Sequence, residues 1–296
     1  MTKHSSHVAA LFNGISYDEP ERGVAMQYKI VFSDIDGTLL TDKQIVLDST
    51  KRAVQELLLR DIPFVLVSAR MPEAILPLAE GMGVEIPIIA YSGALVLLAD
   101  GEEIANQPMP LLEATKIIAY IEKMYPQALL NFYAGHIWYV RDRSDERVTV
   151  EEDVTGVQAV ESDYSKLLRE GFLPHKLLVI AEPDLCAQME IELRAQFPTL
   201  NIVRSAGHLL EIMGGGISKA TGIQAMLQCF GIQASEAIAF GDNYNDLEMF
   251  HYVGCAVAMG NAPEDVKHEA QVVTATNNED GISKFLQKIN LVPIET

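Results

Sequence analysis

The chain has 296 residues, 49% of them hydrophobic and 21% charged, a length that corresponds to roughly two domains of ordinary size. Its 22 Lys and Arg residues against 41 Asp and Glu residues give a net charge of −19. A negative charge of this size repels nucleic acids and anionic lipid surfaces, so neither is expected as a partner. No apolar run approaches the ~18 residues that a membrane-spanning helix needs.

The cysteines and the N-terminal segment bear on the cellular compartment. The three cysteines are spaced for neither a zinc site nor a CxxC redox pair, and their odd number does not suit a disulfide framework. A cytoplasmic location is therefore expected. Residues 1–26 hold one short apolar run followed by acidic residues, unlike a signal peptide, and are expected to form an N-terminal extension. The sequence leaves open whether translation starts at Met1 or Met26.

From residue 27 onward, short apolar runs alternate with amphipathic segments. Nearly continuous apolar runs are typical of strands buried on both faces of a parallel sheet. Such strands are predicted at 29–34, 62–68, 87–92, 237–242 and 255–260. Helices with a capping residue, a leading proline or apolar residues at helical spacing are predicted after Asp48 and at 72–80, 218–231 and 246–252.

The alternation is interrupted between residues 107 and 205. That segment predicts a helix at 111–125, a hairpin at 128–140 with Ala134-Gly135 at its turn, a strand at 176–182 and a helix at 184–196. Its acidic run at 151–153 is expected to be a solvated loop.

The predicted fold class is α/β, with a doubly wound, mostly parallel Rossmann-like sheet and an inserted α+β cap domain. The expected divisions are an extension at 1–26, a first core part at 27–106, the cap at 107–205 and a second core part at 206–296.

Polar residues follow the predicted core strands. Ligands of open parallel sheets bind at the carboxyl ends of the strands. The residues found at these ends include Asp34, Asp36, Thr38, Ser68, Arg70, Ser92, Gly93, Asp242, Asn245 and Asp246. Two carboxylates about 4 Å apart repel each other by about 4 kcal/mol at an effective dielectric near 20, so a cation is expected among them. Oxygen ligands without His or Cys favour Mg²⁺, which commonly shares a substrate phosphate, and the pattern therefore predicts a phosphate ester as substrate.

Each half of this pattern has a simpler interpretation when taken alone. The sequence at 34–37 is typical of an Asx turn or a calcium-binding loop, and 241–246 is a plausible polar turn. An EF-hand is excluded because Ile45 stands where the glutamate at its twelfth position would be required. The presence of both sequences at strand ends of one βα chain favours a catalytic site.

The motifs resemble those of the haloacid dehalogenase-like phosphatases, and specifically the Cof-type hydrolases with a large α/β cap (class IIB). The resemblance rests on Asp34-Ile-Asp36-Gly37-Thr38, Ser68-Ala-Arg70, Ile217-Ser218-Lys219 and Gly241-Asp242-Asn243-Tyr-Asn245-Asp246, in family order. It extends from Lys29 to about Ile289. One departure is Ser92-Gly93-Ala94, where the family usually has Asn-Gly-Ala.

The resemblance, together with the chemistry of these groups, implies their roles. Asp34 is the expected nucleophile, and Asp36 the acid and base that serves the leaving alcohol and then the attacking water. Mg²⁺ is expected on Asp34, the backbone carbonyl of Asp36 and Asp242, with Asp246 holding a metal-bound water. Ser68 and Lys219 are expected to contact the transferring phosphoryl group. The further phosphate or substrate contacts are expected to be Thr38, Arg70, Ser92, Gly93 and Asn245, with the alternative for Arg70 that it only pairs with an acid.

The expected function is Mg²⁺-dependent hydrolysis of a small phosphorylated metabolite, either a sugar phosphate or a phosphorylated cofactor, by a monomer or homodimer. Two alternatives remain open. A phosphomutase would share every core motif, whereas a non-catalytic phosphate-binding module would have no chemical need for both Asp34 and Asp36.

Overall fold

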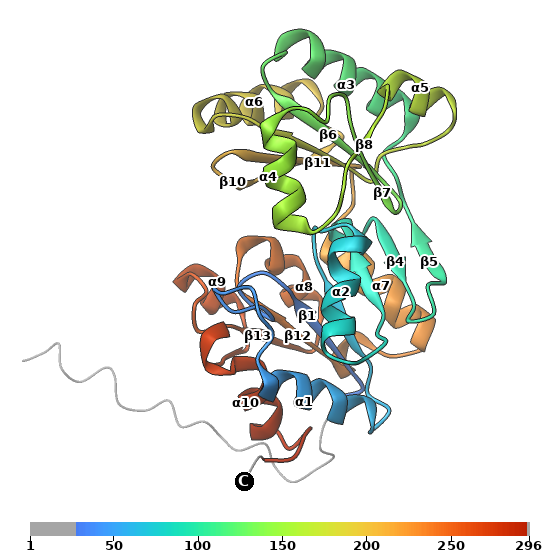
Figure 1. The fold of residues 1–296 in the computed structure, drawn as a ribbon. Coiled ribbons are helices and arrows are strands. Elements are labelled where there is room, and N and C mark those ends of the chain that lie inside the picture. The colour runs from blue at the N-terminus through green and yellow to red at the C-terminus, as the bar shows by residue number, and fades with distance from the viewer. Residues whose placement is uncertain (1–27, 295–296) are drawn as a thin grey trace, which may run out of the picture.

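The computed structural model describes residues 28–294, which fold into two domains, each built on a sheet of its own (Figure 1). The N-terminal extension expected at residues 1–26 lies outside the described residues. Within the described part of the chain, no helix is both long and apolar enough to cross a lipid bilayer.

The larger domain, here called the core domain, contains an eight-stranded sheet. Six strands are parallel in the order β14-β13-β12-β1-β2-β3, and β4 and β5 continue the sheet in antiparallel fashion. Along the chain the strands are β1 (Ile30–Asp34), β2 (Phe64–Val67), β3 (Ile88–Ala90), β4 (Leu95–Leu97), β5 (Glu103–Asn106), β12 (Ala237–Gly241), β13 (Cys255–Ala258) and β14 (Val272–Val273). The doubly wound, mostly parallel sheet predicted from the sequence is confirmed.

Helices cover both faces of this sheet. One face packs against α1 (Asp48–Leu58), α2 (Pro72–Gly81) and α10 (Gly281–Lys288), and the other against α7 (Lys219–Phe230), α8 (Leu247–Tyr252) and α9 (Glu264–Glu269). Alternate strand residues point to opposite faces, so Val31 packs with the first group of helices, and Ile30 and Phe32 with the second. Asp34 follows Phe32 by two positions, and its carboxylate therefore leaves β1 on the side of α7.

The second domain, here called the cap, is inserted between β5 and α7 (Figure 1). Its six-stranded sheet has the order β10-β11-β9-β6-β7-β8 and is antiparallel except for the β7-β8 pair. The strands are β6 (Leu129–Ala134), β7 (Ile137–Val140), β8 (Val160–Glu161), β9 (Lys176–Ile180), β10 (Asn201–Ala206) and β11 (Leu209–Met213). One face packs against α3 (Leu111–Met124), α5 (Tyr164–Arg169) and α6 (Pro183–Gln196), whereas α4 (Glu146–Thr155) lies on the face toward the core domain.

Several details differ from the sequence prediction. Strands β4 and β5, which were not predicted, extend the core sheet before the insertion. The acidic run at 151–153 lies in α4 and is not a loop. Because β6 continues through Ala134, the hairpin turn is at Gly135-His136. β11 pairs with β9 and β10, so the inserted domain ends after Met213 and not at the expected boundary at residue 205.

Candidate active site

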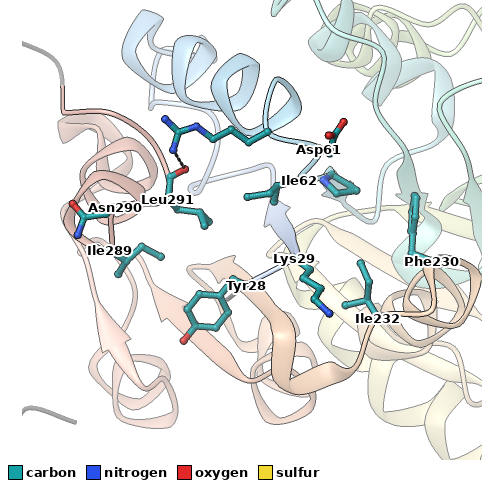
Figure 2. Close-up of a pocket in the computed structure, with 11 residues that line it drawn as sticks. Tyr28, Lys29, Asp61, Ile62, Phe230, Ile232, Ile289, Asn290 and Leu291 are labelled. Atoms are coloured by element: carbon teal, nitrogen blue, oxygen red, sulfur yellow. Dashed lines mark hydrogen bonds between the residues drawn. The ribbon is translucent and has the colours of Figure 1, made fainter. Parts of the chain in front are cut away.

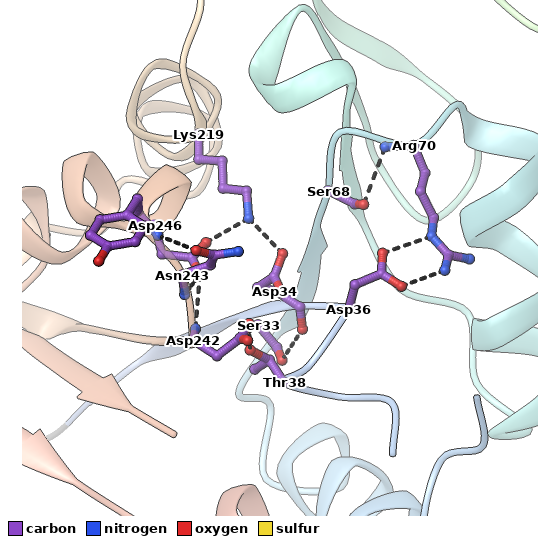
Figure 3. A network of polar contacts seen from close by, with 11 residues as sticks. Ser33, Asp34, Asp36, Thr38, Ser68, Arg70, Lys219, Asp242, Asn243 and Asp246 are labelled. Atoms are coloured by element: carbon purple, nitrogen blue, oxygen red, sulfur yellow. Dashed lines mark hydrogen bonds and ion pairs between the residues drawn. The ribbon is translucent and has the colours of Figure 1, made fainter. Parts of the chain in front are cut away.

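A buried ammonium group joins two carboxylates at the carboxyl edge of the core sheet. Ser218 caps α7 by accepting a hydrogen bond from the Thr221 amide, which makes Lys219 the first residue of the helix and aims its side chain at the sheet. The Lys219 Nζ lies 2.5 Å from Oδ1 of Asp34 and 2.5 Å from Oδ1 of Asp246 (Figure 3). The Lys219 residue is only 2% exposed, so this charge is compensated by the two carboxylates and not by water.

Asp246 also shapes the loop that follows β12. Its Oδ2 accepts hydrogen bonds from the backbone amides of Asp242 and Asn243, at 2.8 and 3.0 Å. Asp246 is expected from the sequence to hold a metal-bound water, but in the structure both of its oxygens already have protein donors. Asp246 therefore holds Lys219 and orients Asp242 at the same time.

Asp242 is held on its other side by the loop after β1. The Thr38 hydroxyl donates to Asp242 Oδ1 at 3.0 Å, and the Asn261 side-chain amide donates to the Gly37 carbonyl at 2.8 Å and to Asp242 Oδ2 at 3.4 Å. Thr38, expected as a phosphate contact, thus positions a carboxylate here. Asn261 was not among the predicted site residues, although its place after the fifth predicted strand was a usable signal.

The three carboxylates form a site whose charge exceeds that of its one lysine. Ligand oxygens of Asp34, Asp242 and Asp246 all lie within 4.8 Å of one another. Burial raises the pKa of Asp34 to about 8, against the opposing charge of Lys219, and with a further rise from Asp246. Burial and the charge of Asp246 raise the pKa of Asp242 to about 6. Oxygen ligands that are costly to ionise together are suited to a hard divalent cation.

Asp36 is turned away from this cluster. Its carboxylate accepts hydrogen bonds from Nε and Nη2 of Arg70, at 2.9 and 2.5 Å, and its side chain is 52% exposed (Figure 3). Of the two roles left open for Arg70, pairing with an acid is the one this conformation contains. Ser68 lies beside Asp34 and Asp36 in the same cavity, and its Oγ accepts a hydrogen bond from the Arg70 amide at 3.2 Å.

The expected contacts after β3 have different surroundings. Ser92 is 8% exposed and lines a cavity of about 410 Å³ together with Lys219 and Asn245. Its φ of 54° and ψ of 28° are left-handed, a conformation that Asn adopts more readily than Ser. Gly93 packs against α7, where an added Cβ would lie 2.2 Å from the Ser218 carbonyl oxygen. Gly93 thus permits the approach of the helix that carries Lys219.

The cap supplies residues that the motifs did not indicate. A cavity of about 340 Å³ opens between the domains and is lined by Asp34, Asp36 and Asp242 from the core domain. From the cap it is lined by Tyr133, Glu151, Thr155, Lys176, Leu178 and Glu211, among others. Two further polar side chains of the cap hairpin are engaged elsewhere: His136 pairs with Glu73, and the buried Trp138 donates to Asn131.

A larger cavity of about 780 Å³ lies at the opposite edge of the core sheet, at the amino ends of β1 and β2 (Figure 2). Its lining is largely apolar, and its two basic side chains are engaged: Lys29 pairs with Glu236 at 2.6 Å, and Arg60 donates to the Leu291 carbonyl at 2.9 Å. The cluster of Asp34, Asp242 and Asp246 lies at the other edge of the sheet, so the cavity between the domains is the candidate active site.

Comparison with known proteins gives the family. The sequence model of the haloacid dehalogenase-like hydrolases matches residues 31–286. A putative phosphatase of Haemophilus influenzae is 38% identical over 266 residues, covering 89% of this chain and 98% of its own. The 5-amino-6-(5-phospho-D-ribitylamino)uracil phosphatase YitU of Bacillus subtilis is 28% identical, with coverages of 88% and 96%. The structure of BT4131, a sugar phosphatase of HAD subclass IIB, matches with a TM-score of 0.76 at 25% identity, covering 89% of this chain and 100% of its own.

The chain therefore belongs to the haloacid dehalogenase-like hydrolases. The family predicted from the four motifs is confirmed, and so is the enzyme class, a hydrolase of the phosphatase type.

The contact between Gly37 and Asp242 generates a first prediction. An added Cβ at Gly37 would lie 2.3 Å from Asp242 Oδ2, at a φ of +78°. We expect Gly37→Ala to displace Asp242 and to lower phosphatase activity at least about 100-fold. The left-handed backbone alone would cost the variant about 1–2 kcal/mol of stability. Gly101→Ala is the matched control, because Gly101 has a φ of +86° and nothing within 4 Å of its Cβ position. Equal activity of the two variants in a phosphate-release assay would refute the role of this contact.

The raised pKa values of Asp34 and Asp242 generate a second prediction. Since the folded state holds these protons more tightly than the unfolded state, the metal-free fold loses stability as pH rises through about 6 and then about 8. A divalent cation, added as MgCl₂ at roughly 100 times its Kd, is expected to raise Tm at pH 8 by about 5 °C or more. At pH 6 the rise is smaller, because the cation must displace protons. Scanning calorimetry against NaCl of equal ionic strength tests this; Asp242→Ala should lose the rise, and a rise that is larger at pH 6 would contradict the assignment.

Proposed function

We propose that this hydrolase is a Mg²⁺-dependent phosphatase of small phosphomonoesters, such as a sugar phosphate or a phosphorylated cofactor, acting through an aspartyl-phosphate intermediate. The observation that carries the proposal is the position of Asp34. Its carboxylate lies at the floor of the cavity between the domains, in contact with a buried ammonium and next to two further carboxylates. The comparisons also support a small phosphomonoester as the substrate, because the relatives named above include a sugar phosphatase and a phosphatase of a phosphoribityl compound.

Asp34 is the proposed nucleophile. One of its oxygens forms the bond to phosphorus while the bond from phosphorus to the leaving oxygen breaks. The Lys219 ammonium, which contacts Oδ1, favours the ionised carboxylate and places positive charge beside the phosphoryl oxygens. The raised pKa of Lys219, caused by Asp246 and Asp34 against the effect of burial, keeps that charge at any working pH.

Asp36 is the proposed acid and base. It gives its proton to the leaving oxygen in the first step, and in the second it accepts a proton from the water whose oxygen displaces Asp34 from phosphorus. The bidentate contact with Arg70 holds the Asp36 carboxylate away from Asp34. The acid step therefore requires the Asp36 side chain to leave Arg70, and its 52% exposure leaves room for that rotation.

Asp34 and Asp242, with Asp246 beside them, are the residues proposed to hold Mg²⁺, together with the Asp36 backbone carbonyl. The donor set fits this ion, since it consists of oxygens and burial raises the pKa of Asp34 and of Asp242. When bound, Mg²⁺ supplies positive charge that lowers the repulsion between an anionic nucleophile and an anionic phosphate.

A phosphomutase is the alternative that the core motifs share. It differs in returning the phosphoryl group to the product and not to water. Mg²⁺-dependent release of inorganic phosphate in a screen of phosphorylated metabolites supports the phosphatase, whereas isomerisation that depends on glucose 1,6-bisphosphate, without phosphate release, supports the mutase. The monomeric or dimeric state and the cytoplasmic location stay predictions.

Substitution of the nucleophile is the direct test. Asp34→Asn keeps the size of the side chain and removes the nucleophilic carboxylate, so turnover is expected to fall at least about 1000-fold with a folded protein. Asp265→Asn, at an exposed position in α9, is the matched control and should keep wild-type turnover. Beryllofluoride with Mg²⁺ should raise the Tm of the wild type and not that of Asp34→Asn. Easily measured turnover by Asp34→Asn would remove the assignment.

The metal and acid-base roles are separated by a Mg²⁺ titration. Asp242→Ala removes a proposed ligand, so its activity should recover in part at high Mg²⁺. Asp36→Asn keeps the backbone carbonyl and loses the titrating group, so its defect should persist at any Mg²⁺ concentration. That defect should be at least about tenfold smaller on an aryl phosphate than on an alkyl phosphate, since a good leaving group needs little protonation. Identical Mg²⁺ responses of the two variants would contradict the division, and full wild-type activity in EDTA would exclude the metal.

A further inference from the structure

The face of the cap sheet that meets the core domain carries charges that the proposed phosphate chemistry does not use. In β9 and β11 alternate residues point to opposite faces: Leu177 and Leu210 pack with the outer helices, whereas Lys176 and Glu211 line the cavity between the domains. Helix α4 adds Glu151 to the same lining. The cap thus presents two carboxylates and one ammonium to whatever is attached to the phosphate.

The ammonium of this group is already engaged. Lys176 Nζ donates to the backbone carbonyl of Ala69, between Ser68 and Arg70, at 2.8 Å. It lies 4.0 Å from Glu211 Oε1 and 5.1 Å from the centre of the Tyr133 ring, and its side chain is 8% exposed. Lys176 therefore ties the cap to the core domain and offsets one glutamate, which leaves it little capacity to hold an anionic substrate.

The glutamates have no such partners. Among residues 28–294, no side chain or backbone group donates a hydrogen bond to the carboxylate of Glu151 or of Glu211, and Glu211 has only the long contact with Lys176. Burial raises the pKa of Glu151 even with Lys176 nearby. Arg204, in the adjoining cavity, is paired with Glu190 at 3.2 Å. The cap lining therefore offers the substrate two carboxylate acceptors, Glu151 and Glu211, and its charges, counted with Lys176, leave an excess of one negative charge.

We propose that Glu151 and Glu211 select the leaving group, accepting hydrogen bonds from its hydroxyl or ammonium groups and repelling a second anionic group. The substrate class is then a phosphomonoester of a neutral polyol or amino sugar, and bisphosphates and phosphorylated acids are excluded. This inference rests on the proposed phosphatase function, whose site supplies the phosphate end of the same cavity. A carboxylate held among these groups is disfavoured because the repulsion acts in a partly buried, weakly screened space.

Matched substrates isolate the charge. Sorbitol 6-phosphate and 6-phosphogluconate differ only in a hydroxymethyl group against a carboxylate, and glucose 6-phosphate and glucosamine 6-phosphate differ only in a hydroxyl against an ammonium. With Mg²⁺ and the full chain, kcat/KM for 6-phosphogluconate is expected to be at least about tenfold below that for sorbitol 6-phosphate. The kcat/KM for glucosamine 6-phosphate should equal or exceed that for glucose 6-phosphate.

Substitution of the glutamates tests their part in this preference. Glu151→Gln and Glu211→Gln keep the size of each side chain and remove its charge, so each should narrow the ratio for the sorbitol pair at least about threefold, and the double variant further. Glu146→Gln is the matched control, because Glu146 is an exposed residue of the same helix as Glu151. The affinities of sorbitol 6-phosphate and 6-phosphogluconate for Asp34→Asn, measured by calorimetry with and without the glutamate substitutions, give the order of binding in the absence of turnover.

The outcomes separate the two proposals. Absence of phosphate release from all four compounds and from an aryl phosphate refutes the phosphatase, while the binding order in Asp34→Asn still decides the inference. The inference is overturned by equal affinity for sorbitol 6-phosphate and 6-phosphogluconate, by tighter binding of 6-phosphogluconate, or by no binding of either compound. A preference that both Gln variants leave unchanged, with Tm values like that of Glu146→Gln, also overturns it.

Discussion

The buried ammonium of Lys219 is the interaction on which the arrangement of the catalytic edge depends. It contacts carboxylates from two separate segments, Asp34 at the end of β1 and Asp246 after β12, and it projects from the first residue of a helix on a third. Removing it would leave two buried carboxylates without a counter-charge, a loss that typically costs about 3–5 kcal/mol. Yet one ammonium cannot balance three acids, which is why burial still raises the pKa of Asp34 and Asp242. This edge of the sheet thus holds more negative than positive charge, an excess that a bound divalent cation would relieve.

Close backbone approach transmits this constraint outward. Gly93 lets the amino end of α7 come against β3, which carries Lys219 to the sheet, and Gly37 lets the loop after β1 reach Asp242. Asp246 closes the arrangement by accepting hydrogen bonds from the amides beside Asp242. Asp36 stands outside this framework, since its partner Arg70 and its own side chain are both partly exposed. The buried carboxylates are those proposed for the nucleophile and the cation. The half-exposed Asp36, held by Arg70, is the one proposed for proton transfer, which needs to reach two different oxygens.

Much of the core domain could be predicted from the sequence because its signals are local. Buried parallel strands have continuous apolar runs in the sequence, and the polar site residues come at or just after the end of each run, as with Asp34 at the end of β1 and Asp242 after β12. The cap residues that line the cavity between the domains have no such signal. Glu151, Lys176 and Glu211 lie on three elements and come together only when the domain folds. Helix α4 was missed because it lacks a continuous apolar stripe: of its residues only Val148 is buried, and Val150 and Val154 are 62% and 68% exposed. The end of the cap after Met213 was missed because the apolar pattern of β11 does not show whether the strand belongs to the core sheet or to the cap sheet, where it pairs with β9 and β10.

The two domains separate chemistry from selection for a physical reason. Positions that face the outer helices of the cap, such as Leu177 and Leu210, are fully buried, and truncating them would leave cavities that typically cost about 2–5 kcal/mol. The alternate positions of the same strands face the cavity between the domains, where the side chains of Lys176 and Glu211 are 8% and 12% exposed. A change of charge without a change of size at Glu211 or Glu151 therefore alters what the cavity accepts, while the same strands keep their register through the opposite face. Since Asp34 and Lys219 belong to another sheet, such changes leave the phosphate end of the cavity as it is, and the alternation of β9 and β11 is what makes the two properties independent.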